Sequence, residues 1–191
     1  STALVGHTGM GKSTLLRQLE PALGVSMLHR EMPTKLARPA RVVGFLSDLF
    51  GFSPKPSSEK ELINLIRQDT HQAVALDDCH NLFLRQVGGF EGWDCFLRVV
   101  NETCDNVFWY LSFNEQAWDF LENLTGRLSY FRQVVRVRPW NERQIRRLIM
   151  RRMHRALYRT SFSDLVVAQV NQVEFRNELG RTSKGYFRVL W

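Results

Sequence analysis

Near its start the chain carries a glycine-rich stretch, Gly6-His7-Thr8-Gly9-Met10-Gly11-Lys12-Ser13-Thr14. Its spacing, G-x-x-x-x-G-K-S, is typical of a loop whose backbone N–H groups surround phosphate groups. In this pattern Lys12 reaches the outer phosphates and Ser13 offers its hydroxyl to Mg²⁺. A short apolar strand, Ala3–Val5, precedes the stretch and a helical pattern follows it, as the motif requires. We therefore expect every residue from Gly6 to Thr14 to take part in nucleotide binding.

A second informative pattern is an apolar strand, residues 73–76, that ends in the acidic pair Asp77 and Asp78. An acid in this position holds Mg²⁺ in phosphate-loop enzymes, so we assign Asp77 to the metal. Asp78 is then placed to polarise the attacking water as a catalytic residue. The alternative is an acidic helix cap, since Asp is a preferred N-cap residue. The position after the phosphate loop, with strand and helix patterns between, favours the catalytic interpretation.

The apolar run in the middle of residues 106–114 predicts a central parallel strand that is covered on both faces. Asn114 lies at its carboxyl end, the edge at which α/β proteins bind ligands. Asparagine at a strand end is most often a turn residue. Here it is also placed to hydrogen-bond the attacking water or the γ-phosphate, and we count it among the candidate catalytic residues.

Strand and helix patterns alternate through residue 139, with further strands expected at residues 25–28 and 134–137. This alternation predicts an α/β fold, a P-loop NTPase three-layer sandwich with a parallel sheet, over residues 1–139. From Trp140 the hydrophobic period becomes helical, which predicts a small α-helical lid over residues 140–191.

The chain is basic, with 26 Lys and Arg against 19 Asp and Glu, and arginine is concentrated just after Trp140. Arg143, Arg147, Arg151 and Arg155 recur there at helical spacing. A solvated helix face would account for this pattern as well as an anion-binding surface would. The second interpretation predicts contact with DNA or another acidic surface, because closely spaced like charges repel one another.

The three cysteines, Cys79, Cys95 and Cys104, have no metal-ligand spacing and are typical of buried thiols in a reducing compartment. No signal peptide is visible, and so we expect a cytoplasmic domain. The chain starts without Met, from which we expect it to be part of a longer polypeptide, and membrane association of that polypeptide stays open.

In motif order, these residues resemble those of the AAA+ ATPases and their STAND relatives. Residues 6–14 resemble Walker A, residues 74–78 resemble Walker B, and Asn114 matches the sensor-1 position. The resemblance implies an arginine finger at Arg127 or Arg132 and a sensor-2 arginine at Arg188, the latter in a Gly-Tyr-Phe-Arg sequence where the family has Gly-Asn-Pro-Arg. Within this group the sequence is most similar to bacterial secretion-accessory and transposition-accessory ATPases.

The resemblance implies an ATPase that binds ATP and Mg²⁺, releases ADP, and works as a conformational switch or as a homo-oligomeric motor. The family's Walker B pair is Asp-Glu, whereas this chain has Asp77-Asp78, as many slowly hydrolysing STAND switches do. Two alternatives remain: a nucleic-acid-associated ATPase or loader that uses the arginine-rich lid, and a regulatory module that binds nucleotide without hydrolysis. ATP is favoured over GTP because the chain lacks an Asn-Lys-x-Asp guanine-recognition sequence.

Overall fold

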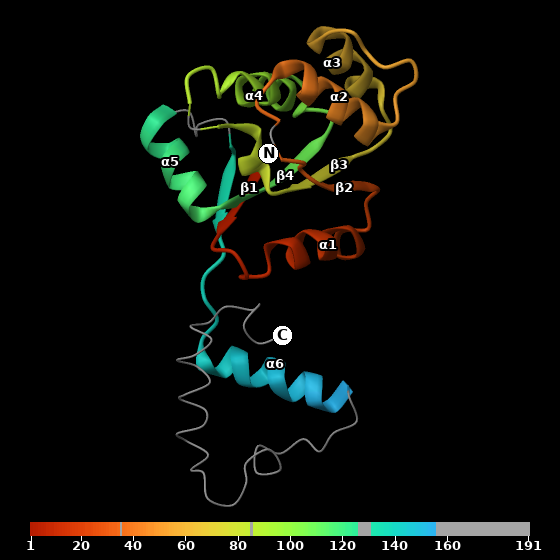
Figure 1. Cartoon of the computed structure of the whole chain (residues 1–191). Helices are drawn as coiled ribbons and strands as arrows, with labels where there is room; N and C mark the ends of the chain where they lie inside the picture. Colours follow the sequence, from red (N-terminus) through yellow and green to blue (C-terminus); the bar gives the residue numbers. More distant parts are fainter. Residues whose placement is uncertain (35, 85, 126–130, 156–191) are drawn as a thin grey trace, which may run out of the picture. The chain divides into compact units, whose positions relative to one another are not determined.

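The computed structural model describes residues 1–34, 36–84, 86–125 and 131–155 (Figure 1). Its elements in chain order are β1 (Thr2–Gly6), α1 (Lys12–Leu23), β2 (Met27–Glu31), α2 (Pro39–Phe50), α3 (Glu59–Gln68), β3 (Ala73–Asp77), the 3₁₀ helix η1 (Cys79–Leu82), α4 (Glu91–Thr103), β4 (Phe108–Asn114), α5 (Glu115–Thr125), β5 (Gln133–Arg136) and α6 (Glu142–Arg155). The chain divides into two compact units, Ser1–His7 with Lys12–Val137, and Thr8–Gly11 with the residues from Arg138 onward.

The first unit is built on a five-stranded sheet with the order β2-β3-β4-β1-β5, in which every neighbouring pair is parallel. The expected α/β fold with a parallel sheet is therefore confirmed. The register pairs Gly6 with Asn114 and Glu31 with Asp77. The carboxyl ends of β1, β2, β3 and β4 consequently meet at one edge, where the sequence places its candidate functional residues.

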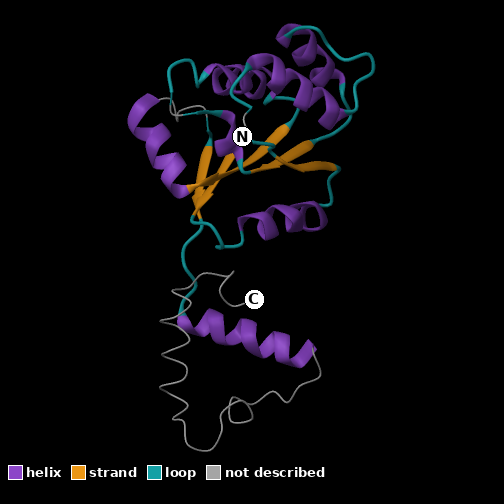
Figure 2. Cartoon of the chain, in the orientation of Figure 1, coloured by secondary structure: helices purple, strands orange, loops and turns teal. Residues whose placement is uncertain are grey.

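Helices cover both faces of the sheet (Figure 2), with α1 on one face and α2, α3 and α4 on the other. The side chains of β1 alternate accordingly. Val5 packs in the larger core with Trp109 of β4, whereas Leu4 packs in the smaller core with Leu16 of α1. All five residues of β3 are buried, so the strand that ends in Asp77 is held rigidly between the two layers.

The two edge strands differ from their expected bounds. We expected a strand at residues 25–28, and β2 instead runs from Met27 to Glu31, including three exposed polar residues. We expected residues 134–137 at the other edge, and β5 runs from Gln133 to Arg136. In both cases backbone pairing with the inner strand sets the bounds, and an edge strand shows little of the burial pattern on which a sequence prediction depends.

The three cysteines are free thiols, two of them buried and Cys104 half-buried. Burial raises the pKa of the Cys95 thiol to about 12 and that of Cys79 well above its usual value. Within the described residues, every helix is too short or too polar to cross a lipid bilayer.

Candidate nucleotide-binding site

The glycine-rich loop joins the end of β1 to the start of α1, so that the expected strand and helix stand on either side of it. Gly9 and Gly11 have φ angles of 86° and 92°, which side chains with a Cβ rarely adopt. Glycine at these two positions therefore allows the backbone path of the loop. Ser13 is half-buried and Thr14 exposed in the first turn of α1.

Lys12 is a buried cation, with 7% of its surface exposed. Its Nζ donates hydrogen bonds to the carbonyl oxygens of Gly6 at 2.8 Å and His7 at 3.0 Å. Burial lowers the pKa of the Lys12 ammonium, while the carboxylates of Asp77, Asp78 and Glu115 act in the opposite direction. One positive charge thus lies within electrostatic range of three negative charges at the carboxyl edge of the sheet.

Asp77 is also buried, with 5% exposed, and two groups hold its carboxylate. The Ser112 hydroxyl donates a short hydrogen bond to Asp77 Oδ1 and accepts one from the Asp78 N–H at 3.0 Å. The same N–H is 3.1 Å from Asp77 Oδ1. These contacts fix the orientation of the carboxylate that the sequence assigns to the metal.

Ser112 is a site residue that the sequence analysis missed. It lies in the apolar run of β4, and its partner Asp77 belongs to the neighbouring strand β3. The available signal was a hydroxyl in a strand predicted to be buried on both faces, since such a group needs a hydrogen-bond partner.

Asp78 has a φ of 55°, in the left-handed region that non-glycine residues rarely occupy. It stands at the N-cap position of η1, but its side chain makes no capping hydrogen bond there. Its carboxylate Oδ1 lies 3.9 Å from His80 Nδ1, and 41% of the side chain is exposed. The acid is therefore not used as a helix cap, and it stays accessible at the edge of the sheet.

Asn114 ends β4 beside Gly6, and its Oδ1 accepts a hydrogen bond from the Gln116 N–H at 3.0 Å. This is the turn contact expected of an asparagine before a helix, here at the start of α5. The next residue, Glu115, was not singled out from the sequence, yet its Oε2 lies 2.7 Å from His7 Nε2 in the phosphate loop.

The candidate arginines are divided between described and undescribed parts of the chain. Arg132 is exposed just before β5, and its backbone N–H donates to the Ser1 carbonyl at 3.1 Å. Arg127 and Arg188 lie outside the described residues.

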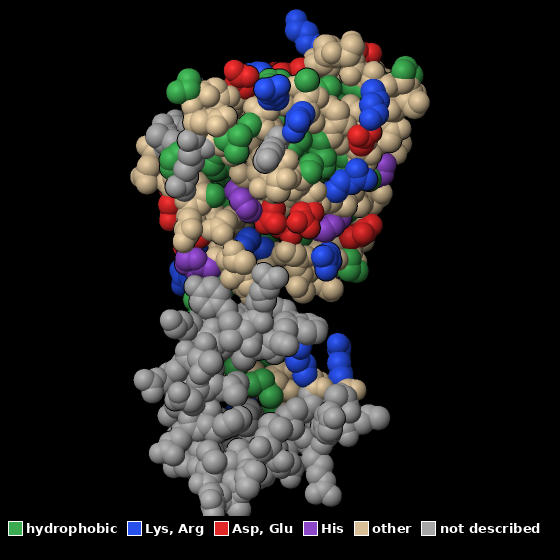
Figure 3. Space-filling model, in the orientation of Figure 1, with side chains coloured by type: hydrophobic (Ala, Val, Ile, Leu, Met, Phe, Trp, Pro, Cys, Tyr) green, Lys and Arg blue, Asp and Glu red, His purple; other side chains and the backbone are tan. Residues whose placement is uncertain are grey.

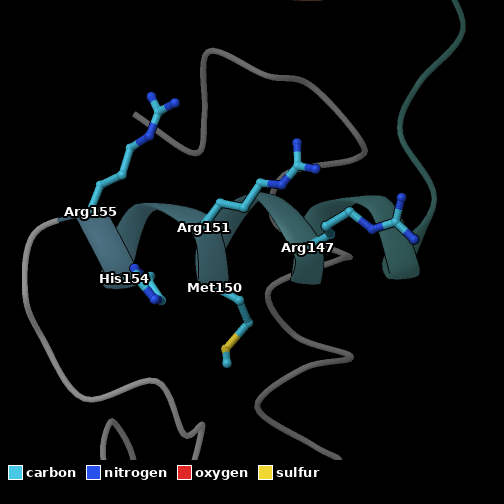
Figure 4. Close-up of a pocket in the computed structure, with 5 residues that line it drawn as sticks. All are labelled: Arg147, Met150, Arg151, His154 and Arg155. Atoms are coloured by element: carbon cyan, nitrogen blue, oxygen red, sulfur yellow. The ribbon is translucent and has the colours of Figure 1, made fainter.

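In the second unit, Arg147, Arg151 and Arg155 project from one side of α6 and Met150 from another (Figure 4). These residues and His154 line a pocket of about 500 Å³.

The first unit carries a mixed surface, with acidic side chains gathered in a band beside histidines on the face shown in Figure 3.

The residues assigned to Mg²⁺, Ser13 and Asp77, offer a hydroxyl and an oriented carboxylate. This donor set fits Mg²⁺, which proteins hold through one or two carboxylates while phosphates and water complete its shell.

Several solved structures share this fold. ORC1 of Aeropyrum pernix, solved in complex with DNA, matches with 21% identity and a TM-score of 0.56 over 81% of this chain and 44% of its own. A Walker-type ATPase of Pyrococcus abyssi matches with 18% identity and a TM-score of 0.59 over 99% and 60%. The RuvB branch-migration motor of Thermotoga maritima matches with 14% identity and a TM-score of 0.57 over 99% and 51%. The chain shares the parallel α/β fold of these P-loop proteins.

At these identities the likeness concerns the fold, and the chain spans about half the length of the solved structures that it matches. No protein-family profile and no curated protein sequence matches the chain.

Proposed function

We propose that this chain is a cytoplasmic ATP-binding domain that hydrolyses ATP slowly with Mg²⁺ and acts as a nucleotide-dependent switch in a larger protein. The observation that carries the proposal is the buried ammonium of Lys12 beside Asp77 and Asp78, directly after a glycine-rich loop. Burying a charge costs free energy unless interactions with paired groups or with a bound ligand compensate for the loss of water. Phosphates in the loop would be such a ligand.

Each group of the site would have one part in the reaction. The loop N–H groups and Lys12 would bind the phosphates, while Ser13 and Asp77 would hold Mg²⁺, which neutralises charge on the transferred phosphoryl group. Asp78 and Asn114 would orient the attacking water. Because Asp78 is one methylene shorter than the Glu expected from the resemblance, we propose slow turnover, as in STAND switches. We retain the secretion- or transposition-accessory type as part of the proposal.

From the resemblance we further propose roles for three arginines. Arg127 or Arg132 would reach the nucleotide of a neighbouring subunit in a homo-oligomer, and Arg188 would contact the nucleotide bound to its own chain. An arginine finger contributes about 10³–10⁵ to turnover in GTPase systems.

Steady-state ATP hydrolysis measured against protein concentration, with Mg²⁺, tests the switch proposal. Specific activity that rises with concentration would show that subunits complete one another's sites. Arg132→Ala should then lower activity at high concentration without changing ATP affinity. Absence of ATP hydrolysis at every concentration would contradict the proposed slow turnover.

A second candidate function, nucleic-acid binding, rests on the charge of α6. The helix carries six arginines and one glutamate, a formal charge of +5, with Arg147, Arg151 and Arg155 at successive i, i+4 positions. Like charges at this spacing destabilise a helix by about 0.2–0.5 kcal/mol per pair. A polyanion would remove that repulsion, and one of the matching structures, ORC1, was solved with DNA.

Fluorescence anisotropy with a labelled DNA duplex tests this candidate across a series of salt concentrations. Affinity should fall steeply with salt, and Arg147→Glu with Arg151→Glu should flatten the slope by about 2 units. Arg30→Glu with Arg41→Glu is the matched control, because it makes the same charge change at exposed arginines of the first unit. If both double variants lose DNA affinity equally, binding depends on the net charge of the chain alone.

The third candidate, a module that binds nucleotide without hydrolysing it, is favoured by the Asp77-Asp78 pair. Asp78→Glu distinguishes it from the switch. If this variant gains turnover that the wild type lacks, the domain binds nucleotide with its hydrolysis suppressed at Asp78. If Asp78→Glu also shows no turnover, the shorter side chain of Asp78 is not what suppresses hydrolysis.

A further inference from the structure

Glu115 lies where the ends of β1, β4 and β5 meet, and it contacts two of them. It is the first residue after β4, and its Oε2 is 2.7 Å from His7 Nε2, just after β1. Its other carboxylate oxygen, Oε1, is 3.8 Å from Nη1 of Arg136, the last residue of β5. One carboxylate therefore stands between the phosphate loop and the final strand.

The end of β5 also packs on the phosphate loop through the backbone. The N–H of Val137, which directly follows Arg136, donates to the Val5 carbonyl at 2.7 Å. A Cβ placed on Gly6 would lie 3.2 Å from the Val137 Cβ and 3.3 Å from its carbonyl oxygen. A side chain at position 6 would therefore crowd Val137, so the phosphate loop begins in close contact with the end of β5.

His7 is the residue at which this contact network meets Lys12. Its carbonyl oxygen accepts from Lys12 Nζ at 3.0 Å, while its imidazole pairs with Glu115. To bind a phosphate, the Lys12 ammonium has to exchange the carbonyls of Gly6 and His7 for phosphate oxygens. Nucleotide entry would therefore remove a hydrogen bond from the residue that Glu115 holds.

We propose that Glu115 is a positioning residue that couples nucleotide binding in the phosphate loop to the end of β5. This inference rests on the proposed nucleotide-binding function. Loss of the Lys12 contact lets His7 move, Glu115 follows its imidazole, and the pairing with Arg136 changes. The backbone then responds at Val137, the last residue before the chain passes into the second unit.

The contacts around Arg136 provide a matched control. Its guanidinium also lies 3.5 Å from Asp119 Oδ1 and 3.2 Å from Glu122 Oε2, and both of these acids belong to α5. Glu122 therefore shares Arg136 with Glu115, whereas the ion pair with the His7 imidazole is made by Glu115. A general effect of the charge near Arg136 would appear in variants at both glutamates, whereas coupling through His7 would appear only in variants at Glu115.

Hydrogen–deuterium exchange of the full chain, with and without Mg²⁺ and a non-hydrolysable ATP analogue, measures the coupling at residues 133–137. In the wild type we expect the analogue to change the exchange rate at Val137. Glu115→Gln and Arg136→Gln should lose that response, while Glu122→Gln should keep it. Because these contacts are partly exposed, Glu115→Gln should weaken analogue affinity by no more than about fivefold, so the variant can be saturated.

The outcomes separate the inference from the function on which it rests. A wild type that does not bind the analogue refutes the proposed function, and the coupling with it. A wild type that binds it but shows no response at residues 133–137 refutes the coupling alone. A response that persists in saturated Glu115→Gln, or that disappears equally in Glu122→Gln, also overturns the role of Glu115.

Discussion

Lys12 must be charged to bind phosphates, yet it is buried where charge is disfavoured. Burial lowers its pKa from the usual 10.5, against the opposing effect of Asp77, Asp78 and Glu115. Between the lowered pKa and 10.5 the folded chain binds fewer protons than the unfolded chain, so the contribution of Lys12 to stability rises with pH across that window. ATP affinity should change in the opposite direction, because binding needs the ammonium form.

We therefore predict that ATP affinity falls as pH rises through the lowered pKa, by about tenfold per pH unit above it. Lys12→Arg is the control, since a guanidinium stays charged throughout this range. Lys12→Arg should bind ATP more weakly than the wild type, with an affinity that does not change with pH. Calorimetric titrations at several alkaline pH values would show the difference, and parallel profiles for the two proteins would argue against a functional Lys12 ammonium.

Ser112 gives a second prediction at this scale. Ser112→Ala leaves the Asp78 N–H and the buried Asp77 carboxylate with one partner fewer, which should cost about 1–3 kcal/mol of unfolding free energy. It should also raise the Mg²⁺ concentration needed for hydrolysis, because Asp77 is less firmly oriented.

Ser47→Ala is the matched control for Ser112→Ala, since Ser47 is equally buried but donates to the Val43 carbonyl within its own helix. Urea unfolding and Mg²⁺-dependence of turnover measure both effects. If Ser47→Ala shifts the Mg²⁺ dependence as much as Ser112→Ala, the proposed orienting role of Ser112 is wrong.

At the residue scale, the sequence indicated the groups that belong to a contiguous motif. Gly6–Thr14 and the acids at the end of β3, Asp77 and Asp78, were singled out from spacing alone, and their roles stay predictions. Ser112 and Glu115 were missed because their partners come from other segments, Asp77 from the neighbouring strand β3 and His7 from the loop after β1, and the strand order is absent from local spacing. The roles assigned to Asp78, Asn114 and the arginines stay predictions.

At the scale of elements, alternating strand and helix patterns predicted the parallel α/β fold, but two features needed the structure. The order β2-β3-β4-β1-β5 depends on packing between elements far apart in the sequence. The bounds of β2 and β5 depend on backbone pairing with β3 and β1. By contrast, the central strand β4 was located correctly because burial on both faces leaves a continuous apolar run.

Two helical glycines should respond in opposite directions to the same substitution. In α2, a Cβ on Gly44 would meet nothing within 4 Å, so Gly44→Ala should stabilise the chain by about 0.5–1 kcal/mol. In α4, a Cβ on Gly92 would lie 2.2 Å from the Leu36 carbonyl oxygen, so Gly92→Ala should destabilise it by about 1–3 kcal/mol or more. Urea unfolding of both variants tests the packing of these helices, and the same sign for both would contradict it.

At the scale of the whole molecule, charge is distributed unevenly. The chain has a formal net charge of +7, and α6 alone contributes +5, whereas the first unit gathers Asp77, Asp78 and Glu115 near Lys12. We propose a magnesium-bound nucleotide as the ligand of the first unit and a polyanion as the ligand of α6. Variants of Lys12 should then affect only the first kind of binding, and variants of the α6 arginines only the second.

Isothermal titration calorimetry of Mg²⁺–ATP with the wild type and with Lys12→Ala tests whether the glycine-rich loop binds ATP. Circular dichroism should first show that the variant keeps its fold. We predict a saturable binding heat for the wild type and none for Lys12→Ala, because the ammonium that meets the phosphates is gone. Undiminished affinity in a folded Lys12→Ala variant would contradict the assignment of the loop.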